Sequence, residues 1–165
     1  MTQAAAEILT TGAKVLYQEA LPVTGFNAAL GELAHTLTLT MQQANGVGIA
    51  APQIGVSLRL FIVASRPNER YPDAPSMAPL LMINPELRAH SIETEIGEEG
   101  CLSVPGARVR ISRYRWVDAR WQDEQGNYHQ QRLEGFIARI FQHELDHLDG
   151  ITLLERIKVQ ESCHL

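Results

Sequence analysis

The segment FQHELDHLDG, residues 141–150, holds two histidines four positions apart, His143 and His147, with Glu144 directly after the first. On an α-helix, residues four apart share one face, so both imidazoles can bind one metal ion from a single rigid element. The carboxylate of Glu144 would then reach a water bound to that ion. The simpler interpretation is an exposed helix that carries polar residues by chance. The neighbouring residues are apolar: Phe136, Ile137, Ile140, Phe141, Leu145 and Leu148. They predict a partly buried site, where polar side chains need partners.

Two histidines do not complete a metal site, and the residues that follow them offer no suitable third ligand. Leu153 stands where the pattern H-E-x-x-H-x-x-G-x-x-H would require a histidine. Only 18 residues follow His147, too few for a further helix to pack back and supply a glutamate. We expect the end of the chain, about residues 159–165, to be frayed or disordered. The remaining candidates are therefore poor: Glu155, Glu161, Cys163 and His164.

Cys101 is the upstream candidate for the third ligand. It lies in EEGCLSVPG, residues 98–106, between a glycine and a strand-like stretch. A lone cysteine is more often a small buried hydrophobic residue than a ligand. Together with His143 and His147, however, it completes a set of three ligands that leaves the fourth tetrahedral position for water, as hydrolytic metal sites require. The sequence therefore predicts a Cys-His-His site.

The periodicity of the chain predicts the elements that must position these residues. Apolar residues recur every three or four positions over 26–44, which predicts an amphipathic helix with Pro22 and Thr24 as start signals. A second helix is predicted over 134–150, ending at Gly150. The order helix, several strands, helix indicates an α+β fold without the alternation of a parallel sheet.

The segments between the two helices are predicted to form strands and loops. The segment 45–55 is too rich in glycine and proline for a regular element, and 66–79 is a polar, proline-rich loop. A turn at 123–127 is predicted to join two strands into a hairpin. The predicted strands cover 58–64, 80–87, 90–98, 114–122 and 128–134.

The composition of the chain excludes several classes of protein but does not identify its function. The 165 residues are 45% hydrophobic, which suits one globular domain, residues 1–165, with an ordinary core. A net charge of −5 argues against phosphate-backbone binding as the main function, and no nucleic-acid motif is found. No apolar run is long enough for a membrane span, and the N-terminus shows no secretory signal. Two cysteines are too few for a disulfide framework, so we expect a cytoplasmic, reduced protein.

Three short segments resemble the motifs of bacterial peptide deformylases, in the same order. They are GVGIAAPQ at 46–53, EGCLS at 99–103 and QHELDH at 142–147, against the family patterns G-x-G-x-A-A-x-Q, E-G-C-L-S and Q-H-E-x-D-H. A looser resemblance covers residues 7–158. The chain departs from the family at 13–16, which reads AKVL where many members have D-x-R-L, and it ends sooner after the last motif than many relatives. These departures bear on stability and ribosome contact more than on chemistry.

The resemblance implies a fold and a reaction. The fold would be a single α+β domain with mostly antiparallel sheets around the helix that carries H-E-x-x-H. The reaction would be hydrolytic removal of the formyl group from the N-formylmethionine of new polypeptides. Cys101, His143 and His147 would hold one divalent ion, with Fe(II) favoured physiologically and Zn(II), Ni(II) or Co(II) also accommodated. The ion would supply hydroxide at neutral pH, and Glu144 would accept the water proton and return it to the leaving amine.

The resemblance also assigns oxyanion donors, and the glycines of the first motif indicate backbone contacts with the substrate. The side-chain amide of Gln53 and the backbone N–H of Leu102 would stabilise negative charge on the formyl oxygen. A loop glutamine that caps backbone groups is the alternative for Gln53. Gly46 and Gly48, with Val47 between them, would let the substrate backbone pair with this segment by strand addition. A purely structural turn would also explain the glycine pair.

Selectivity for methionine requires an apolar pocket beside the ion. Phe136 and Ile140 lie seven and three positions before His143 on the same helix face, and with Val47 they are the candidates for that pocket. The same residues would serve equally well as core.

Arg108 aligns with a family arginine near the outer residues of the substrate. The expected partners are N-formylmethionyl nascent peptides, with transient ribosome contact, no membrane and a monomeric state.

Two other functions compete with the deformylase prediction. A metallopeptidase would cleave internal amides, but the missing downstream ligand disfavours it. A non-catalytic binding module of the same family would be expected to have lost Glu144, Gln53 or a metal ligand, and all of these are present.

Overall fold

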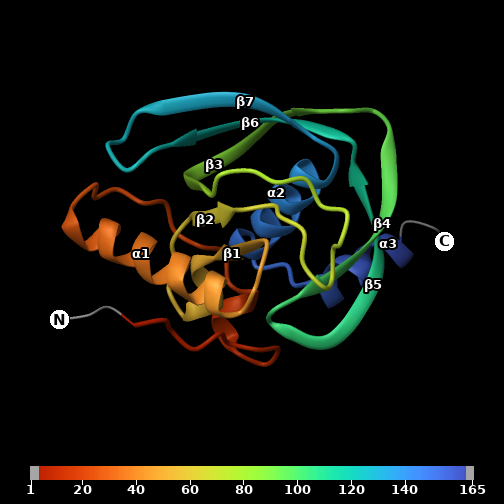
Figure 1. Ribbon diagram of the computed structural model, residues 1–165, viewed down its shortest axis with the longest axis horizontal. Helices are drawn as coiled ribbons and strands as arrows, with labels where there is room; N and C mark the ends of the chain where they lie inside the picture. The colour runs from red at the N-terminus through yellow and green to blue at the C-terminus, as the bar shows by residue number, and fades with distance from the viewer. Residues whose placement is uncertain (1–3, 163–165) are drawn as a thin grey trace.

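The computed structural model describes residues 4–162, and the helix α2, Gly135–Leu148, lies in the middle of the molecule (Figure 1). Gly135 has a φ of 58°, which lets the chain turn sharply from a strand into the helix. At the other end Gly150 has a φ of 75°, so the helix ends in a left-handed residue at the predicted position. A Cβ on Gly150 would lie 2.9 Å from the backbone of Tyr17. Packing as well as backbone conformation therefore requires glycine there.

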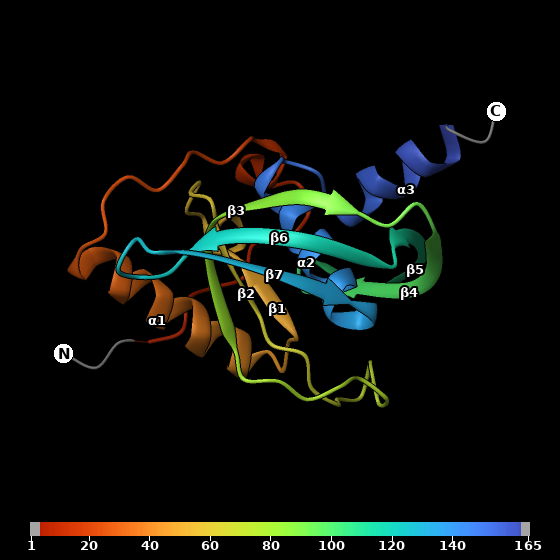
Figure 2. The ribbon, with the colours of Figure 1, turned by 90° about the horizontal axis from the view of Figure 1, so that it is seen from above.

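A five-stranded antiparallel sheet packs on α2, with the strand order β1-β2-β3-β6-β7 (Figures 1 and 2). The strands are β1 Gly48–Ala50, β2 Leu60–Val63, β3 Leu80–His90, β6 Trp116–Gln122 and β7 Tyr128–Glu134. Along β6 the residues Val117, Ala119 and Trp121 are buried in alternation, as expected for a strand with one face on the core. This face shares one apolar cluster with Ala138 and Phe141 of α2.

Two further strands form a separate antiparallel pair, β4, Thr94–Cys101, and β5, Val104–Tyr114. In Figures 1 and 2 this pair lies at the end of the molecule away from α1. Its register is regular up to Gly100 and shifts at Cys101, which pairs with Val104. Such irregularities re-aim side chains, often next to functional sites. Here the shift falls at the predicted sulfur ligand.

The predicted first helix is confirmed as α1, Ala28–Gln43, but its predicted start is wrong. Asn27, rather than Pro22 or Thr24, is the N-cap, because its Oδ1 accepts a hydrogen bond from the N–H of Leu30 at 3.1 Å. The buried face of α1 shares a second core cluster with β1 and β2, through Leu30, Leu37 and Met41.

The described end of the chain, up to Ser162, is helical rather than frayed. A third helix, α3, Leu153–Ser162, extends into the tail predicted to be disordered, and residues 163–165 lie outside the described part. Gln160 holds α3 on β5: its Oε1 accepts from the N–H of Ser112 at 2.8 Å, and its Nε2 donates to the carbonyl of Arg110 at 3.3 Å. A helix therefore does pack back after α2. The prediction was wrong because tertiary contacts, rather than the local pattern, stabilise this helix.

The glycine-rich segment 45–55 is more regular than predicted. It contains β1 and a 3-10 helix, η2, Ala51–Ile54. Its regularity depends on pairing with β2, which is distant in sequence and invisible in local composition. A second 3-10 helix, η1, spans Lys14–Tyr17.

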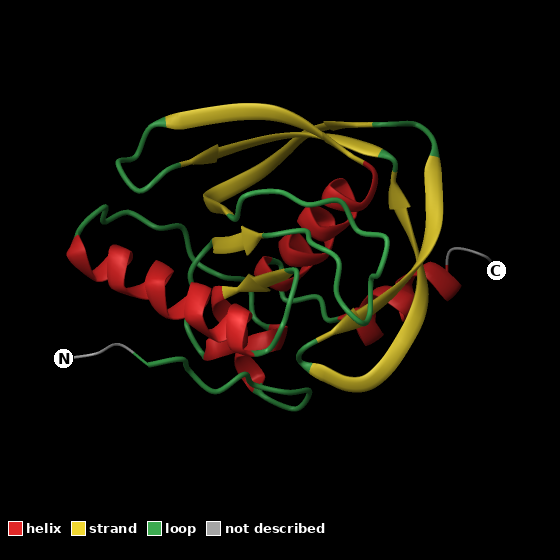
Figure 3. Ribbon diagram, in the orientation of Figure 1, coloured by secondary structure: helices red, strands yellow, loops and turns green. Residues whose placement is uncertain are grey.

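The predicted strands and the hairpin at 123–127 are confirmed, with some bounds corrected: β3 extends to His90, and the strand predicted over 90–98 is β4, which begins at Thr94 and ends at Cys101. β5 was recognised only as a strand-like stretch. Figure 3 shows the mixture of strands and helices that confirms the α+β class. Within residues 4–162, no helix combines the length and apolar character needed to cross a membrane.

Candidate metal centre

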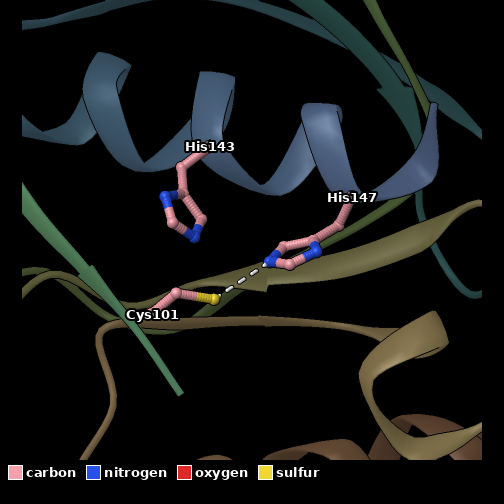
Figure 4. A group of neighbouring side chains, drawn as sticks. All are labelled: Cys101, His143 and His147. Carbon is pink, nitrogen blue, oxygen red and sulfur yellow. Dashed lines mark hydrogen bonds between the residues drawn. The ribbon is translucent and has the colours of Figure 1, made fainter. Parts of the chain in front are cut away.

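Cys101, His143 and His147 lie together where the end of β4 meets α2 (Figure 4). One ligand-type atom from each lies within 4.8 Å of the others, and Cys101 Sγ is 3.3 Å from His147 Nε2. The two histidines project from successive turns of α2, as their spacing predicts. The irregular end of β4 turns the thiol toward them.

This donor set fits one divalent transition-metal ion. A thiolate and two imidazole nitrogens are ligands that such ions accept, and three protein ligands leave a position for water or substrate. Cys101 is 6% exposed, and burial alone would raise the pKa of its thiol. The neighbouring His147 and His143 instead hold that pKa well below its ordinary value. The thiolate, which is the form that binds metal, is therefore favoured.

Glu99 orients one of the imidazoles. Its Oε1 lies 2.9 Å from His143 Nδ1, and both Arg113 and Arg139 donate to the same carboxylate. Burial would raise the pKa of Glu99, but hydrogen bonds from His143 and Arg113 hold it well below its usual range. An ionised carboxylate only accepts hydrogen bonds, so His143 donates from Nδ1 and presents Nε2 to the site. This role was not predicted, although the position of Glu99 two residues before Cys101 in a motif was a usable signal.

Glu144 lines the same pocket as Cys101 and His143 and is 4% exposed. Burial raises the pKa of its carboxyl to about 7, so near neutral pH this group can both accept and release a proton. Its Oε1 is buried and has no hydrogen-bond partner among residues 4–162. A water or a substrate amide can supply that partner.

The side chain of Gln53 is fixed at both ends. Its Oε1 accepts from the backbone N–H of Ala50 at 2.9 Å, and its Nε2 donates to Ser103 Oγ at 3.0 Å and lies 3.8 Å from Cys101 Sγ. Gln53 therefore does cap a backbone group, which was the alternative role considered for it. This contact leaves the amide nitrogen directed toward Cys101. Leu102 lies in the turn between β4 and β5 and lines the adjoining pocket. The support from Ser103 was not predicted, although it belongs to the EGCLS motif.

A pocket opens beside these groups, lined by five of the predicted substrate residues: Gly46, Val47, Gly48, Phe136 and Ile140. Ile140 is 3% exposed and belongs to the main core cluster, against which Val47 and Phe136 pack. These side chains are core residues that also form one wall of the pocket. Gly48 has a packing reason of its own, because a Cβ there would lie 2.7 Å from Glu144 Oε2 and 2.9 Å from Ile140 Cγ2.

The loop between β2 and β3 forms another side of the pocket, which the sequence did not predict. Arg70 and Tyr71 line it. The Tyr71 ring packs on Phe136 with centroids 4.7 Å apart, and its hydroxyl accepts from the N–H of Gly100 at 3.0 Å. Arg108 is not among the pocket-lining residues of the described chain. Its guanidinium lies over the Tyr71 ring, 5.3 Å from the centroid, and donates to the Arg70 carbonyl.

Known proteins that are similar to this chain are enzymes of the same kind as the site suggests. The model of the polypeptide deformylase family matches residues 5–162. The chain is 53% identical to peptide deformylase 2 of Shewanella oneidensis over 154 residues, which cover 93% of this chain and 85% of the relative. It is 44% identical to the peptide deformylase of Thermotoga neapolitana, covering 89% of this chain and 84% of that relative.

Solved structures show the same likeness in three dimensions. A class I type b peptide deformylase from Acinetobacter baumannii, bound to Met-Ala-Ser, matches with a TM-score of 0.91 at 44% identity, covering 94% of this chain and 99% of that chain. The predicted resemblance is confirmed. The chain belongs to the polypeptide deformylase family, metal-dependent hydrolases that remove the formyl group from the N-terminus of new peptides.

Proposed function

We propose that this protein deformylates N-formylmethionyl peptides at the site that contains Cys101, His143, His147, Glu144 and Gln53. One observation carries the proposal: three side chains able to bind a metal lie together, and two of them, Cys101 and His143, line one pocket with the buried carboxyl of Glu144. A binding module has no need of that carboxyl. A metallopeptidase of the H-E-x-x-H type would be expected to take its third ligand from a downstream histidine or glutamate, whereas the third donor here is an upstream cysteine.

Cys101, His143 and His147 would hold the metal ion, which supplies Lewis acidity and lowers the pKa of bound water toward neutrality. The donor set accommodates Fe(II), Zn(II), Ni(II) or Co(II), and membership of the family favours Fe(II) as the physiological ion. Glu99 would keep His143 in the tautomer that directs Nε2 into the site.

Glu144 would move the proton. Its carboxylate accepts a proton from water as the water oxygen attacks the formyl carbon, and then donates that proton to the amide nitrogen as the C–N bond breaks. The products are formate and a peptide with a free α-amine. A pKa of about 7 suits a group that must both accept and donate at neutral pH.

Gln53 and Leu102 would stabilise the negative charge that develops on the formyl oxygen. The amide of Gln53 is already oriented by Ala50 and Ser103, so little reorganisation is required when the charge appears. The backbone N–H of Leu102, next in sequence to Cys101, would be the second donor.

The substrate would place its methionine side chain against Phe136 and Ile140 and its backbone along residues 46–48. The Acinetobacter baumannii relative is described with Met-Ala-Ser bound, and a free amine on methionine is the chemistry of the deformylated product. Arg108 would act on the outer residues of the peptide through its contact with Tyr71.

Formate release from formyl-Met-Ala-Ser, measured beside cleavage of unblocked Met-Ala-Ser, tests the proposal. We expect one formate for each new free amine and no cleavage of the unblocked peptide. Metal analysis after anaerobic purification would identify the ion. Cleavage of the unblocked peptide without formate release would show that the protein is a peptidase and not a deformylase.

We further propose that the chain acts as a single catalytic domain and as a monomer in the cytoplasm, where it would meet nascent peptides through transient ribosome contact. The family membership supports the substrate. Sedimentation analysis would test the monomer, and cosedimentation with ribosomes at low and high salt would test the contact.

A further inference from the structure

A continuous series of charged side chains joins the C-terminal helix to the metal centre. Arg156 of α3 contacts Asp146 of α2, Asp146 contacts Arg113 of β5, and Arg113 contacts Glu99 of β4. Glu99 in turn accepts from His143. We propose that Arg156 is a positioning residue for the metal site, acting through this series on the orientation of His143. The proposal rests on the proposed function, in which His143 binds the ion.

The inner part of the series is geometrically stiff. Arg113 binds Glu99 in a bidentate pair, Nε to Oε2 and Nη2 to Oε1, both at 2.9 Å. Its remaining nitrogen, Nη1, donates to Asp146 Oδ2 at 2.6 Å. Because a guanidinium is planar and rigid, a displacement at its Asp146 end moves its Glu99 end as well. Glu99 Oε1 accepts hydrogen bonds from both Arg113 and His143. A displacement of Glu99 therefore also moves the imidazole of His143.

Arg156 controls the outer carboxylate. Its Nε lies 3.0 Å from Asp146 Oδ2 and its Nη2 lies 2.5 Å from Oδ1. Asp146 Oδ2 is therefore shared between Arg156 and Arg113. Arg156 fixes the plane of this carboxylate and offsets part of its charge. Without Arg156, Asp146 would be free to rotate toward Arg113 and compete with Glu99 for the same guanidinium.

Exposure to solvent increases along the series from Glu99 to Arg156, so Arg156 is the member best suited to substitution. Side-chain exposure is 3% for Glu99, 5% for Arg113, 12% for Asp146 and 29% for Arg156. Removing a buried member would leave an unpaired charge in the interior and destabilise the protein strongly. Changing Arg156 leaves Asp146 still paired with Arg113, so the fold should survive.

The test compares Arg156→Gln with the unmodified full-length protein, both loaded with Co(II). We expect the visible absorption bands of Co(II), which report its ligand geometry, to shift. We expect the ion to be lost to excess chelator about 3–10 times faster, a smaller effect than the roughly 10–100-fold change typical of direct partners of metal ligands. For formyl-Met-Ala-Ser, kcat should fall while KM stays unchanged. Arg156→Lys should restore part of each change.

Two control variants distinguish an effect transmitted through Asp146, Arg113 and Glu99 from weaker packing of α3 on the rest of the protein. Lys158→Gln makes the same charge change on the same helix, at an exposed side chain that pairs only weakly with Glu155 at 3.7 Å. Gln160→Ala removes another anchor of α3 on β5. We expect Lys158→Gln to change nothing and Gln160→Ala to lower the melting temperature without moving the Co(II) bands.

Unaltered bands and ion loss in Arg156→Gln would overturn the proposal, and so would an equal effect of Gln160→Ala. An unmodified protein that lacked a thiolate–Co(II) absorption band or formate release would instead contradict the proposed function itself. The two failures are therefore distinguishable.

Discussion

Cys101 and Glu144 are both buried acids, yet their surroundings prepare them for opposite tasks. The two histidines stabilise the Cys101 thiolate against the effect of burial. For Glu144 burial is the dominant effect, and it raises the pKa to about 7. One group is thus prepared to bind as an anion and the other to exchange a proton. Substitutions at these two positions should separate ion binding from catalysis.

Cys101→Ala should lose the bound ion, because two imidazoles remain from a set of three donors. Cys163→Ala is the matched control and should keep its ion; Cys163 lies outside the described residues. Metal content per chain, measured by elemental analysis after dialysis, checks both variants. A full complement of metal in Cys101→Ala would remove this residue from the ligand set.

Glu144→Gln should keep the shape of the site and its ion but cannot accept a proton. We expect kcat/KM for formyl-Met-Ala-Ser, normalised to bound metal, to fall by about 10²–10⁴. Glu144→Asp should also be slow, since withdrawing the base by about 1 Å can reduce the rate by about 10². A purely structural role predicts a lower melting temperature with activity per folded molecule preserved. That result would exclude Glu144 as the base.

At the scale of elements, the site depends on how closely β1 approaches α2. Gly48 of β1 provides the space, because a Cβ there would meet Glu144 Oε2 at 2.7 Å, Ile140 Cγ2 at 2.9 Å and the Ile62 carbonyl oxygen at 3.1 Å. The backbone carbonyl cannot move away as a side chain could. The proposed general base and one wall of the pocket therefore depend on the same glycine.

Gly48→Ala should push Glu144 and Ile140 away from β1. We expect a loss of about 1–3 kcal/mol in the free energy of unfolding, as for other overpacked cores, and a fall in kcat/KM of about 10² if the carboxylate shifts by about 1 Å. Denaturant unfolding and formate-release kinetics measure the two effects.

Gly31→Ala is the matched control for that substitution. Gly31 lies within α1, where the nearest atom to an added Cβ is Glu124 Oε2 at 3.9 Å. Alanine should stabilise this helix by about 0.5–1 kcal/mol without changing turnover. Equal behaviour of the two variants would contradict the role of close packing at Gly48.

The elements that local patterns predicted differ physically from those that they missed. The helix α2 and the β6–β7 hairpin carry their own periodicity and turn residues, so the sequence alone predicted them. β1 exists because β2 pairs with it, and α3 is held on β5 by Gln160. Contacts between distant segments of the chain determine these elements, and no local pattern encodes them.

At the scale of the whole molecule, distant segments of the chain converge on one site. The N–H of Leu9 donates to the Gln53 carbonyl and that of Thr11 to the Ser103 carbonyl, so the N-terminal segment supports the predicted oxyanion donor from behind. The donors themselves were predictable from residue type and spacing. The roles of their supporting groups, such as Glu99 and Ser103, were not predicted: membership of the EGCLS motif was a usable signal, but the contacts that define these roles form only in the folded chain.

Because the proposed metal donors come from both β4 and α2, ion binding should stabilise the whole fold. At a free ion concentration 100 times its dissociation constant, binding contributes about 2.7 kcal/mol. For a chain of this size that corresponds to a rise in melting temperature of about 5–11 °C. Calorimetry of the chelator-treated protein, before and after addition of Zn(II), measures the shift. Cys101→Ala should show almost none of it, whereas Glu144→Gln should retain it. If Cys101→Ala gained the same stability from Zn(II), the ion would be acting elsewhere on the molecule, and the Cys-His-His site would lose its structural role.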